Sequence, residues 1–516
     1  MKKPKKKDWL KAKGYLHITN RINISNERGK INKLVKNPSL VAKHAFCPLF
    51  HKKITERRYK VISYTEKGTA VRNHSKFDKK GKKVSTKKIR PIHYATHIDA
   101  QIYSYYSSEI LQKKYESELI KNSHLSECIL AYRRIKIDNS KSHKNNIHFA
   151  KEIFDEIKSK DECVAFAFDI ENFFSSLNHK HLKKAWCQLL DTKSLPPDHY
   201  NIFKSITNFS YINLNDLRVN PISYDEKKLS ENRKMGTQAF FSSIHEFRKK
   251  INDGELRIYK NQFLDKDKKI CGIPQGLAIS AMLANLYLFE FDKEMYNEIS
   301  IKFRGIYRRY SDDIAIVCPL EHKNEIESIV EKKLKKYHLN ISSGKTEICR
   351  FKRNTNGLLD SYGIKKIKDE EIEIEGIPLK YLGFEFNGRK ILIKSKNLSK
   401  FYRRMKYAIK SKAKRIKILK EKNLLTEVPI YKRKIYRSYT DKGSRSKKII
   451  AKISRLEKND ITGIFEYKIK KKDRKYWGNF IGYAYRASKI MGDKSIKRQV
   501  RNHKKILKKT LKKYFG

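Results

Sequence analysis

The sequence predicts an α+β protein that ends in a basic, helical C-terminal part. Short β-prone runs such as CVAFAFDI at 163–170 alternate with amphipathic helical segments over the first three quarters of the chain. From Ser395 onward the strand pattern is almost absent. A chain of 516 residues is too long for one ordinary core, so we expect two or three packed units. We place a basic extension at 1–89, a mixed α+β region at 90–394 and the helical region at 395–516.

The first elements follow from residue periodicity and from turn residues. Within the basic extension, short helical patterns precede a charged, turn-rich connector at 78–88. A clear amphipathic helix is expected at 99–119, because its apolar residues recur at helical spacing. The segment 128–137 predicts a strand, and the segment 145–157 predicts another helix.

The later elements again mix buried strands and helices. The apolar run at 163–170 ends in one acid and predicts a buried strand, after which a long helical and loop stretch follows. A Pro-Gly loop opens a helix at 271–292, and a charged helix is expected at 321–337. Further strands are expected around Asp312 and within 339–351 and 379–393.

The charge balance indicates a nucleic-acid partner. Lys and Arg number 119 against 55 Asp and Glu, which gives a formal net charge of +64. Such a surface repels itself unless a polyanion neutralises it, and phosphate backbones are the commonest polyanions. Residues 395–516 hold 41 Lys and Arg but 8 acids, and aromatic residues interrupt them repeatedly. This pattern predicts a helical domain that lies along a nucleic-acid duplex; a merely solvated Lys-rich bundle is the alternative.

Cysteine usage and hydropathy favour an intracellular protein. The seven cysteines are scattered and form no CxxC pair, so we expect reduced thiols in a cytosolic protein, with neither a zinc site nor a disulfide framework. The basic N-terminus has no following apolar segment, and the longest nearly apolar run, at 277–289, is too short to span a bilayer. We therefore expect a soluble protein with no membrane partner.

Three carboxylates lie at the ends of β-prone runs or between two of them. Asp312 and Asp313 lie between GIYRRY and IAIVC, and Asp169 closes the run VAFAF. Acidic pairs are common in turns and most of them bind nothing. If the strand before Asp169 packs beside the hairpin, however, the three charges repel one another unless a cation neutralises them. With no His or Cys nearby, the acids favour Mg²⁺, and a pair of such ions is a general device for in-line phosphoryl transfer.

Five motifs in order make residues 90 to 395 resemble the reverse transcriptases. FAFDIENFF is similar to motif A, GIPQG to motif B, YSDD to motif C, SSGKTEI to motif D and LKYLGFEF to motif E. The resemblance implies a right-hand polymerase, with fingers and a ferredoxin-like palm sheet over 90–394. An all-α, thumb-like, nucleic-acid-binding domain would follow over 395–516.

The resemblance also assigns roles to the acids and their neighbours. Asp169 and Asp312 would be the metal ligands, with help from the Ile170 carbonyl, and Asp313 would support them. Two Mg²⁺ ions are implied, with Mn²⁺ as a substitute. Lys345 matches the lysine of motif D and would donate a proton to pyrophosphate.

Nucleotide-binding residues follow from the same comparison. Phe174 matches the steric gate that excludes a ribose 2′-hydroxyl, which implies deoxynucleotide substrates. Its alternative role is that of a core aromatic, for which Phe173 is the better candidate. Gln275 and Gly276 match the loop against the incoming nucleotide, and Gly276 would allow a close backbone approach.

Two further groups of residues complete the expected site. Arg90 and Arg133 lie in the finger-like region and are candidates for clamping the triphosphate by charge and position. Tyr381, Leu382 and Gly383 would form the primer grip.

Within the reverse transcriptases, the chain resembles bacterial unknown-group, defence-associated enzymes, which are related to the abortive-infection enzymes. Its length and lysine content point toward the type 9 systems. The resemblance implies a cytoplasmic anti-phage role with a partner noncoding RNA as template or scaffold; some relatives form homo-oligomers. Two other functions stay open: template-independent homopolymer synthesis with protein priming, and a catalytically idle RNA-binding scaffold.

Overall fold

The computed structural model describes residues 9–56, 60–64, 70–78, 81–140, 142–221, 223–342, 344–367, 370–421, 432–445, 447–458, 461, 465–476 and 478–515. The chain divides into two compact units. The first comprises Met1–Lys121, Asn172–Phe289 and Leu456–Tyr467, and the second comprises Asn122–Glu171, Glu290–Arg455 and Lys468–Gly516. The domain boundaries expected at 89/90 and 394/395 stay a prediction.

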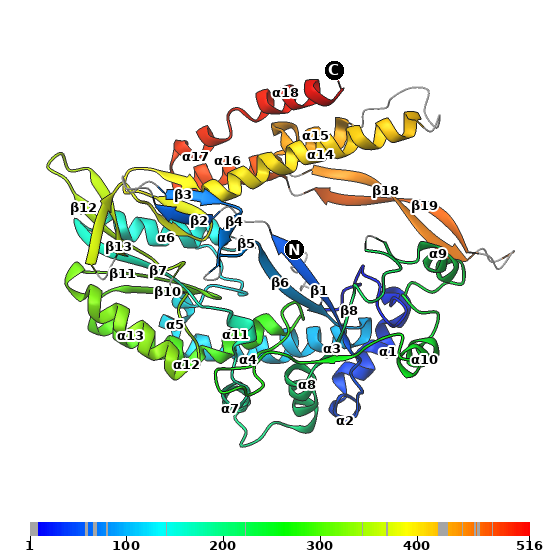
Figure 1. The fold of residues 1–516 in the computed structure, drawn as a ribbon. Helices are drawn as coiled ribbons and strands as arrows, with labels where there is room; N and C mark the ends of the chain where they lie inside the picture. Colours follow the sequence, from blue (N-terminus) through cyan, green and yellow to red (C-terminus); the bar gives the residue numbers. More distant parts are fainter. Residues whose placement is uncertain are drawn as a thin grey trace. The chain divides into compact units, whose positions relative to one another are not determined.

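The first unit is built on a four-stranded sheet (Figure 1). Its elements are α1 (Ile24–Lys36), α2 (Pro38–Ala42), β1 (Leu49–Glu56), β2 (Lys60–Tyr64), β3 (Ala70–Asn73), β4 (Ser75–Phe77), β5 (Lys83–Ser85), β6 (Lys88–Tyr94), α3 (His97–Tyr105), η1 (Tyr106–Leu111), α4 (Gln112–Lys121), η2 (Phe173–Ser175), α7 (His179–Leu190), α8 (Pro197–Thr207), β8 (Ser210–Asn213), α9 (Glu226–Lys234), α10 (Ile244–Asn252), β9 (Tyr259–Lys260) and α11 (Ser280–Tyr287). The sheet order is β6-β1-β8-β9, with only β1 and β8 parallel. The helix expected at 99–119 is confirmed as the continuous run α3, η1 and α4.

The remaining elements follow in chain order. They are α5 (Ser123–Cys128), α6 (Asn146–Lys158), β7 (Glu162–Asp169), α12 (Phe289–Tyr296), η3 (Asn297–Lys302), β10 (Ile306–Tyr310), β11 (Asp313–Cys318), η4 (Leu320–His322), α13 (Lys323–Lys336), β12 (Glu347–Arg353), β13 (Leu359–Ile367), β14 (Glu370–Glu375), β15 (Leu379–Tyr381), β16 (Phe384–Phe386), β17 (Ile391–Ile393), α14 (Ser395–Glu421), α15 (Lys432–Tyr439), η5 (Asp441–Gly443), β18 (Lys447–Lys458), β19 (Phe465–Tyr476), α16 (Phe480–Met491), α17 (Lys494–Gln499) and α18 (His503–Phe515).

The second unit contains a six-stranded antiparallel sheet in the order β10-β11-β7-β12-β13-β14. Its first four strands are β7, β10, β11 and β12 along the chain, with α12 before β10 and α13 before β12. This order, with two helical crossovers, is the ferredoxin-like arrangement. The predicted α+β class and ferredoxin-like sheet are therefore confirmed.

The central strand β7 is buried on both faces. On one face, Cys163, Ala165 and Ala167 join a core cluster with Phe154 of α6. Figure 1 shows α6 on one side of the sheet, with α12 and α13 on the other. Small side chains on the α6 side let the helix approach the sheet closely, because they leave room for its larger apolar residues. This packing fixes the end of β7, where Asp169 lies.

The all-α prediction for residues 395–516 is wrong in one respect. The segment contains the helices α14 to α18, but β18 and β19 form a two-stranded sheet between α15 and α16. The sequence of β19 begins with Phe465, Tyr467 and Ile469 alternating with charged residues. That alternation is the period of a strand, and the high lysine content hides it from a reading of hydropathy.

The strand expected at 128–137 is also wrong. Helix α5 ends at Cys128, and only Ile129 and Lys136 make isolated bridges in this segment. Tyr132 has a φ of 64°, a left-handed conformation that cannot continue a strand. A bend at this tyrosine therefore replaces the extended backbone.

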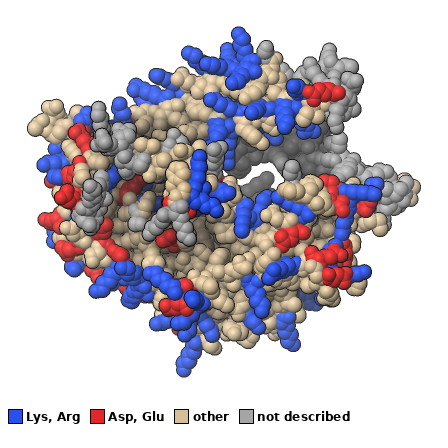
Figure 2. Space-filling view, viewed as in Figure 1, with Lys and Arg blue, Asp and Glu red and all other residues tan. Residues whose placement is uncertain are grey.

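Basic side chains cover the outer faces of the C-terminal helices. Figure 2 shows Lys and Arg gathered over α14 and α18 at the top of the view. The inner faces of these helices bury Met405, Ile409 and Leu507 in an apolar cluster. The two helices are thus amphipathic, with the charge directed outward. No helix in the described ranges is both long enough and apolar enough to cross a membrane.

Candidate active site

The structure brings the three acids singled out in the sequence, Asp169, Asp312 and Asp313, to one end of the six-stranded sheet. Strands β7 and β11 pair antiparallel, and Asp313 lies directly opposite Asp169. Ser311 and Asp312 form the two-residue turn before β11, and the carbonyl of Asp312 accepts a hydrogen bond of 2.9 Å from the Ile170 amide. The pairing confirms the expected adjacency of this strand and the hairpin, across 143 residues of sequence. The catalytic and metal-binding roles of these residues stay predictions.

The acids repel one another in this arrangement. Burial, together with the neighbouring charges of Asp312 and Asp169, raises the pKa of Asp313 to about 7, against the opposing effect of Lys394 and Lys345. A carboxyl that is held above its ordinary pKa by like charges is a site where a cation is favoured. This imbalance of charge is what a bound divalent ion would relieve.

Lys345 takes part in the same cluster. Its ammonium group forms an ion pair and hydrogen bond with the carboxylate of Asp169. The side chain of Lys345 is 39% exposed and that of Asp169 is 22% exposed, so both groups are within reach of solvent. The motif D lysine of the sequence comparison therefore lies next to one of the expected metal ligands.

The chemistry of the donors fits Mg²⁺. Asp169, Asp312, Asp313 and the Ile170 carbonyl offer only oxygen atoms, which are the ligands that this ion prefers. Within the described residues, no three Asp, Glu, His or Cys side chains are already gathered closely enough to hold a metal ion. Burial and the neighbouring carboxylates together keep the pKa of Asp313 raised although Lys394 and Lys345 act against them.

We expect the metal-free protein to lose stability as the pH rises from about 4 to about 7. Folded Asp313 holds its proton up to about pH 7, whereas its ordinary pKa is 3.8, so its protonated form stabilises the fold at low pH and that contribution is lost as the pH rises. Thermal unfolding in EDTA should show a larger decrease in Tm between acidic and alkaline buffer for the wild type than for Asp313→Asn. Equal pH dependence of the two proteins would contradict this account.

Two residues that the sequence analysis missed, Arg309 and Asp292, support the turn at Ser311 and Asp312. Arg309 of β10 and Asp292 of α12 are fully buried and form a two-pronged ion pair, with N–O distances of 2.7 and 2.5 Å. Arg309 also donates to the Ser311 carbonyl at 3.2 Å, and the Tyr307 hydroxyl donates to Asp292 at 2.6 Å. The backbone of the turn is thus tied to a helix beneath the sheet.

Tyr132 is the second missed feature. Its hydroxyl lies 3.1 Å from the Ser311 hydroxyl, within hydrogen-bonding distance. Burial raises its pKa, and the charges of Asp312 and Asp313 act in the same direction. Both Tyr132 and Ser311 have left-handed backbones, with φ of 64° and 61°. A tyrosine in this strained conformation beside two acids is a feature that only the three-dimensional structure could reveal.

Of the three primer-grip candidates, Tyr381 ends β15, and Leu382 and Gly383 form the turn between β15 and β16. Leu382 and Gly383 both have positive φ, of 41° and 93°, so the turn is tight. The Leu382 carbonyl accepts a hydrogen bond of 3.2 Å from the Asn146 side chain. Tyr381 is buried, with 2% of its surface exposed, and its hydroxyl has no hydrogen-bond partner among the described residues. Tyr381 therefore supports this turn from the core, whereas Leu382 and Gly383 are half-buried.

The expected steric gate belongs to the first unit. Phe173 is buried and Phe174 is half-buried, in agreement with a core role for the first and a surface role for the second. The Phe174 carbonyl accepts a hydrogen bond of 2.8 Å from Ile273, and the Leu177 carbonyl accepts one of 2.8 Å from Gly272. The structure thus brings the segment after motif A together with the turn of motif B.

Gln275 and Gly276 continue that turn and lie against β6. The His93 amide donates to the Gln275 carbonyl at 2.8 Å, and a Cβ on Gly276 would lie 2.5 Å from the His93 carbonyl oxygen. Gly276 has a φ of 119°, so only glycine suits this position. Arg90 lies on the same strand and pairs with Glu56 at 3.2 Å.

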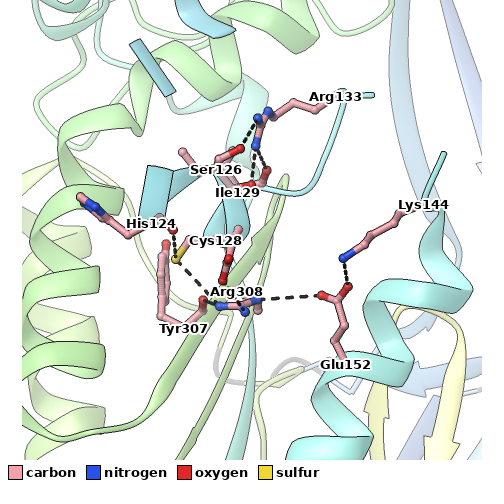
Figure 3. A network of polar contacts seen from close by, with 10 residues as sticks. His124, Ser126, Cys128, Ile129, Arg133, Lys144, Glu152, Tyr307 and Arg308 are labelled. Atoms are coloured by element: carbon pink, nitrogen blue, oxygen red, sulfur yellow. Dashed lines mark hydrogen bonds and ion pairs between the residues drawn. The ribbon is translucent and has the colours of Figure 1, made fainter. Parts of the chain in front are cut away.

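Arg133 makes local contacts in the second unit. Figure 3 shows its guanidinium pointing at the end of α5, where it donates to the carbonyls of Ser126 and Ile129 at 2.7 and 2.8 Å and to the Ser126 hydroxyl at 2.9 Å. These carbonyls would otherwise lack partners at the helix end. The contacts favour a structural role for Arg133, and the triphosphate clamp stays a prediction.

Residues 227–386 match the protein family described as "Reverse transcriptase (RNA-dependent DNA polymerase)". This segment of the chain is similar to reverse transcriptases. It includes Gln275, Asp312, Lys345 and Tyr381, whereas Asp169 lies before it and is connected through the β7–β11 pairing. The match and the ferredoxin-like sheet are consistent with a right-hand polymerase fold. No curated protein matches the chain.

Among solved structures, the chain is similar to telomerases of Candida species. The apo telomerase of Candida tropicalis without its C-terminal domain is 11% identical, with a TM-score of 0.35 over 71% of this chain and 60% of that one. The telomerase of Candida albicans with a fragment of telomeric RNA is 12% identical, with a TM-score of 0.33 over 73% and 52% of the two chains. The chain thus spans about half to three fifths of these telomerases.

Proposed function

We propose that the protein is an RNA-directed DNA polymerase that adds deoxynucleotides to a 3′-hydroxyl. The observation that carries this proposal is the pairing of β7 with β11, which places Asp169 opposite Asp313 beside the YSDD turn. The family match over 227–386 supports the same reaction class. The direct test is whether purified protein, given an RNA template, a primer, dNTPs and Mg²⁺, makes DNA that copies the template.

The residues of the second unit divide the work of this reaction. Asp169 and Asp312, with the Ile170 carbonyl, would hold two Mg²⁺ ions, with Mn²⁺ as a substitute, and Asp313 would add negative charge beside them. When bound, the metal supplies Lewis-acid stabilisation to the attacking and departing oxygens. Lys345 carries a proton close to Asp169 and would pass it to the leaving pyrophosphate. Leu382 and Gly383 would support the primer end.

Phe174 is expected to select the sugar. An aromatic ring at this position collides with a ribose 2′-hydroxyl, so Phe174→Ala should incorporate ribonucleotides that the wild type rejects. The measurement is the ratio of kcat/KM for a dNTP and for the matching rNTP. Phe173→Leu is the control, because Phe173 is buried and its replacement should leave the ratio unchanged. An unchanged ratio for Phe174→Ala would show that Phe174 is not the residue that excludes ribonucleotides.

Two alternatives remain, and different measurements separate them. A template-independent polymerase primed by a protein hydroxyl would make one repeated base after the RNA is digested, whereas copying requires the template sequence in the product. A scaffold that only binds RNA would make no DNA at all. The acids argue against the scaffold, because Asp169, Asp312 and Asp313 repel RNA phosphates unless a cation is bound.

We also propose a biological setting from the sequence resemblance. The size of the chain and its stretches ILAYRR, NNIHFAKEIF and NFIGYAYRASKI resemble bacterial defence-associated enzymes. The length and the lysine content suggest type 9 as the subgroup. In this setting a noncoding RNA partners the protein in the cytoplasm, and the protein self-associates as some relatives do. Sequencing the RNA that copurifies, together with the DNA made from it, tests this setting.

A further inference from the structure

A cavity of about 1230 Å³ lies in the second unit, outside the candidate active site. Its described walls come from three parts of the chain: Ile137 and residues 142–148 up to the first turn of α6, the residues around η5 at 441–445, and the helix α16 at 482–490. None of the acids at the end of β7 and β11 lines it. The volume exceeds that of a single nucleotide, so the cavity is large enough for a ligand of that size.

The wall of the cavity is positively charged. Arg445 and Arg486 both line it and both are exposed. Asp441 is the single acid among the described lining residues, and its charge is balanced by Lys504 at 3.0 Å. Two guanidinium groups facing one cavity, with the only acid already paired, favour a ligand that carries phosphate.

Polar and aromatic groups complete the wall. The backbone N–H of Asn145 donates a hydrogen bond of 3.2 Å to Nδ1 of His148. In the neutral ring the proton is therefore on Nε2, which can donate a hydrogen bond. Tyr485 adds an aromatic ring to the same cavity, and Lys497 lies over that ring at 5.5 Å. A flat ring beside phosphate-binding groups is the combination that holds a base and its phosphate together.

The backbone segments around the cavity pack closely against one another. A Cβ on Gly482 would lie 2.1 Å from the Ser444 carbonyl, so glycine at this position lets the segment that carries Arg445 lie directly on α16. Helices α6 and α16 share the apolar core through Ile147, Ala484 and Ala487. The backbone segments that carry the charged groups are therefore held in one closely packed frame.

The same frame touches the primer-grip turn. The Asn146 side chain donates to the Leu382 carbonyl at 3.2 Å and to the Tyr483 hydroxyl at 2.9 Å. Asn146 follows Asn145, which lines the cavity, and Tyr483 lies next to Gly482, which lines it too. One side chain thus connects both walls of the cavity to that turn.

We propose that this cavity binds a phosphorylated nucleoside, either as a free nucleotide or as one unit of a single-stranded nucleic acid. Arg445 and Arg486 hold the phosphate, His148 donates a hydrogen bond, and Tyr485 packs against the base. The cavity is separate from the carboxylates, so binding here does not require the divalent ion of the candidate active site.

The test measures equilibrium binding by the full chain in EDTA, which removes metal-dependent binding at the acids. The probes are a fluorescein-labelled single-stranded RNA and a fluorescent ATP analogue. The variant Arg445→Gln/Arg486→Gln is compared with Lys489→Gln/Lys494→Gln, which removes the same charge from exposed residues of the same unit that do not line the cavity. All four side chains are exposed, so both variants should fold, and circular dichroism checks this.

We expect the arginine variant to bind at least one probe about tenfold or more weakly, and the lysine variant to lose less than about threefold. If the arginine variant binds both probes more weakly, the cavity recognises the nucleotide unit itself. If it binds only the RNA or only the ATP analogue more weakly, the ligand of the cavity is single-stranded nucleic acid or a free nucleotide, respectively. Gly482→Ala, which displaces Ser444, should weaken the same probe. Wild-type affinity of the arginine variant for both probes, or an equal loss in the lysine variant, overturns the proposal. Because no DNA is made in this assay, its outcome is independent of the polymerase test.

Discussion

Asp312→Asn is expected to reduce DNA synthesis by about three orders of magnitude or more. Asn keeps the shape of the side chain but removes its negative charge, and with it the attraction for a divalent cation. The metal stabilises the transition state by several kcal/mol, and each 1.4 kcal/mol or so corresponds to about a tenfold change in rate. Asp169→Asn should have a similar effect, because Asp169 lies at the adjoining end of β7. Primer-extension rates under single-turnover conditions measure the loss.

The matched control for this prediction is Asp161→Asn. Asp161 directly precedes β7, at the end of the strand opposite to Asp169. Its side chain is 94% exposed, and its ion pair with Arg353 lies at the surface. The control therefore removes the same charge without touching the acid cluster, and it should keep nearly full activity. Circular dichroism of all variants excludes loss of fold as the cause. Substantial synthesis by Asp312→Asn would refute the site assignment, and an equal loss in Asp161→Asn would show that net charge alone is responsible.

The central part of the site could be predicted from the sequence because its signals are local. A buried strand that ends in an acid is visible in VAFAFD, and an acidic turn between two β-prone runs is visible in YRRYSDDIAIV. Their pairing follows from the need to bury both apolar strands in one sheet. The register of that pairing was not predicted, because Asp169 was expected to face Asp312, whereas Asp313 lies directly opposite it.

The side-chain contacts that individual residues make with distant partners could not be predicted in this way. Asp292 looks like an ordinary acid in a helix, and only the fold shows that it is fully buried against Arg309. Arg133 was chosen for its charge and position, yet its hydrogen bonds go to the end of α5, a helix that ends where a strand was expected to begin. In a chain with 119 Lys and Arg, charge alone identifies no single residue. The contacts of Arg133 with the end of α5 and the burial of Asp292 against Arg309 depend on the tertiary structure.

The left-handed backbone of Tyr132 was likewise invisible, because nothing in the sequence distinguishes it from the other 29 tyrosines. The strands β18 and β19 are a different case. Their alternation is present in the sequence, but lysines occupy the polar positions and lower the mean hydropathy, so the period of two was overlooked. A search for periodicity that ignores the size of the hydropathy would have found them.

Asp292→Ala is expected to lower the free energy of unfolding of the second unit by about 3–5 kcal/mol. The substitution leaves the Arg309 guanidinium buried without its carboxylate, and an uncompensated buried charge is among the most destabilising changes known in proteins. Urea denaturation measures the loss. The control is Glu331→Ala, which removes the partner of Lys335 from an ion pair whose side chains are 54% and 61% exposed, and which should change stability by less than about 0.5 kcal/mol. Similar stabilities of the two variants would contradict a supporting role for the buried pair.

Replacing the whole pair separates its two contributions. In Asp292→Leu with Arg309→Met, no buried charge remains, and apolar side chains in place of a buried ion pair are often neutral or stabilising. This double variant should therefore be closer to the wild type in stability than Asp292→Ala. It still lacks the donor to the Ser311 carbonyl, which lies next to Asp312 in the turn. Its DNA synthesis should consequently stay below that of the wild type although its fold is restored, and full recovery of both properties would mean that the turn keeps its geometry without Arg309.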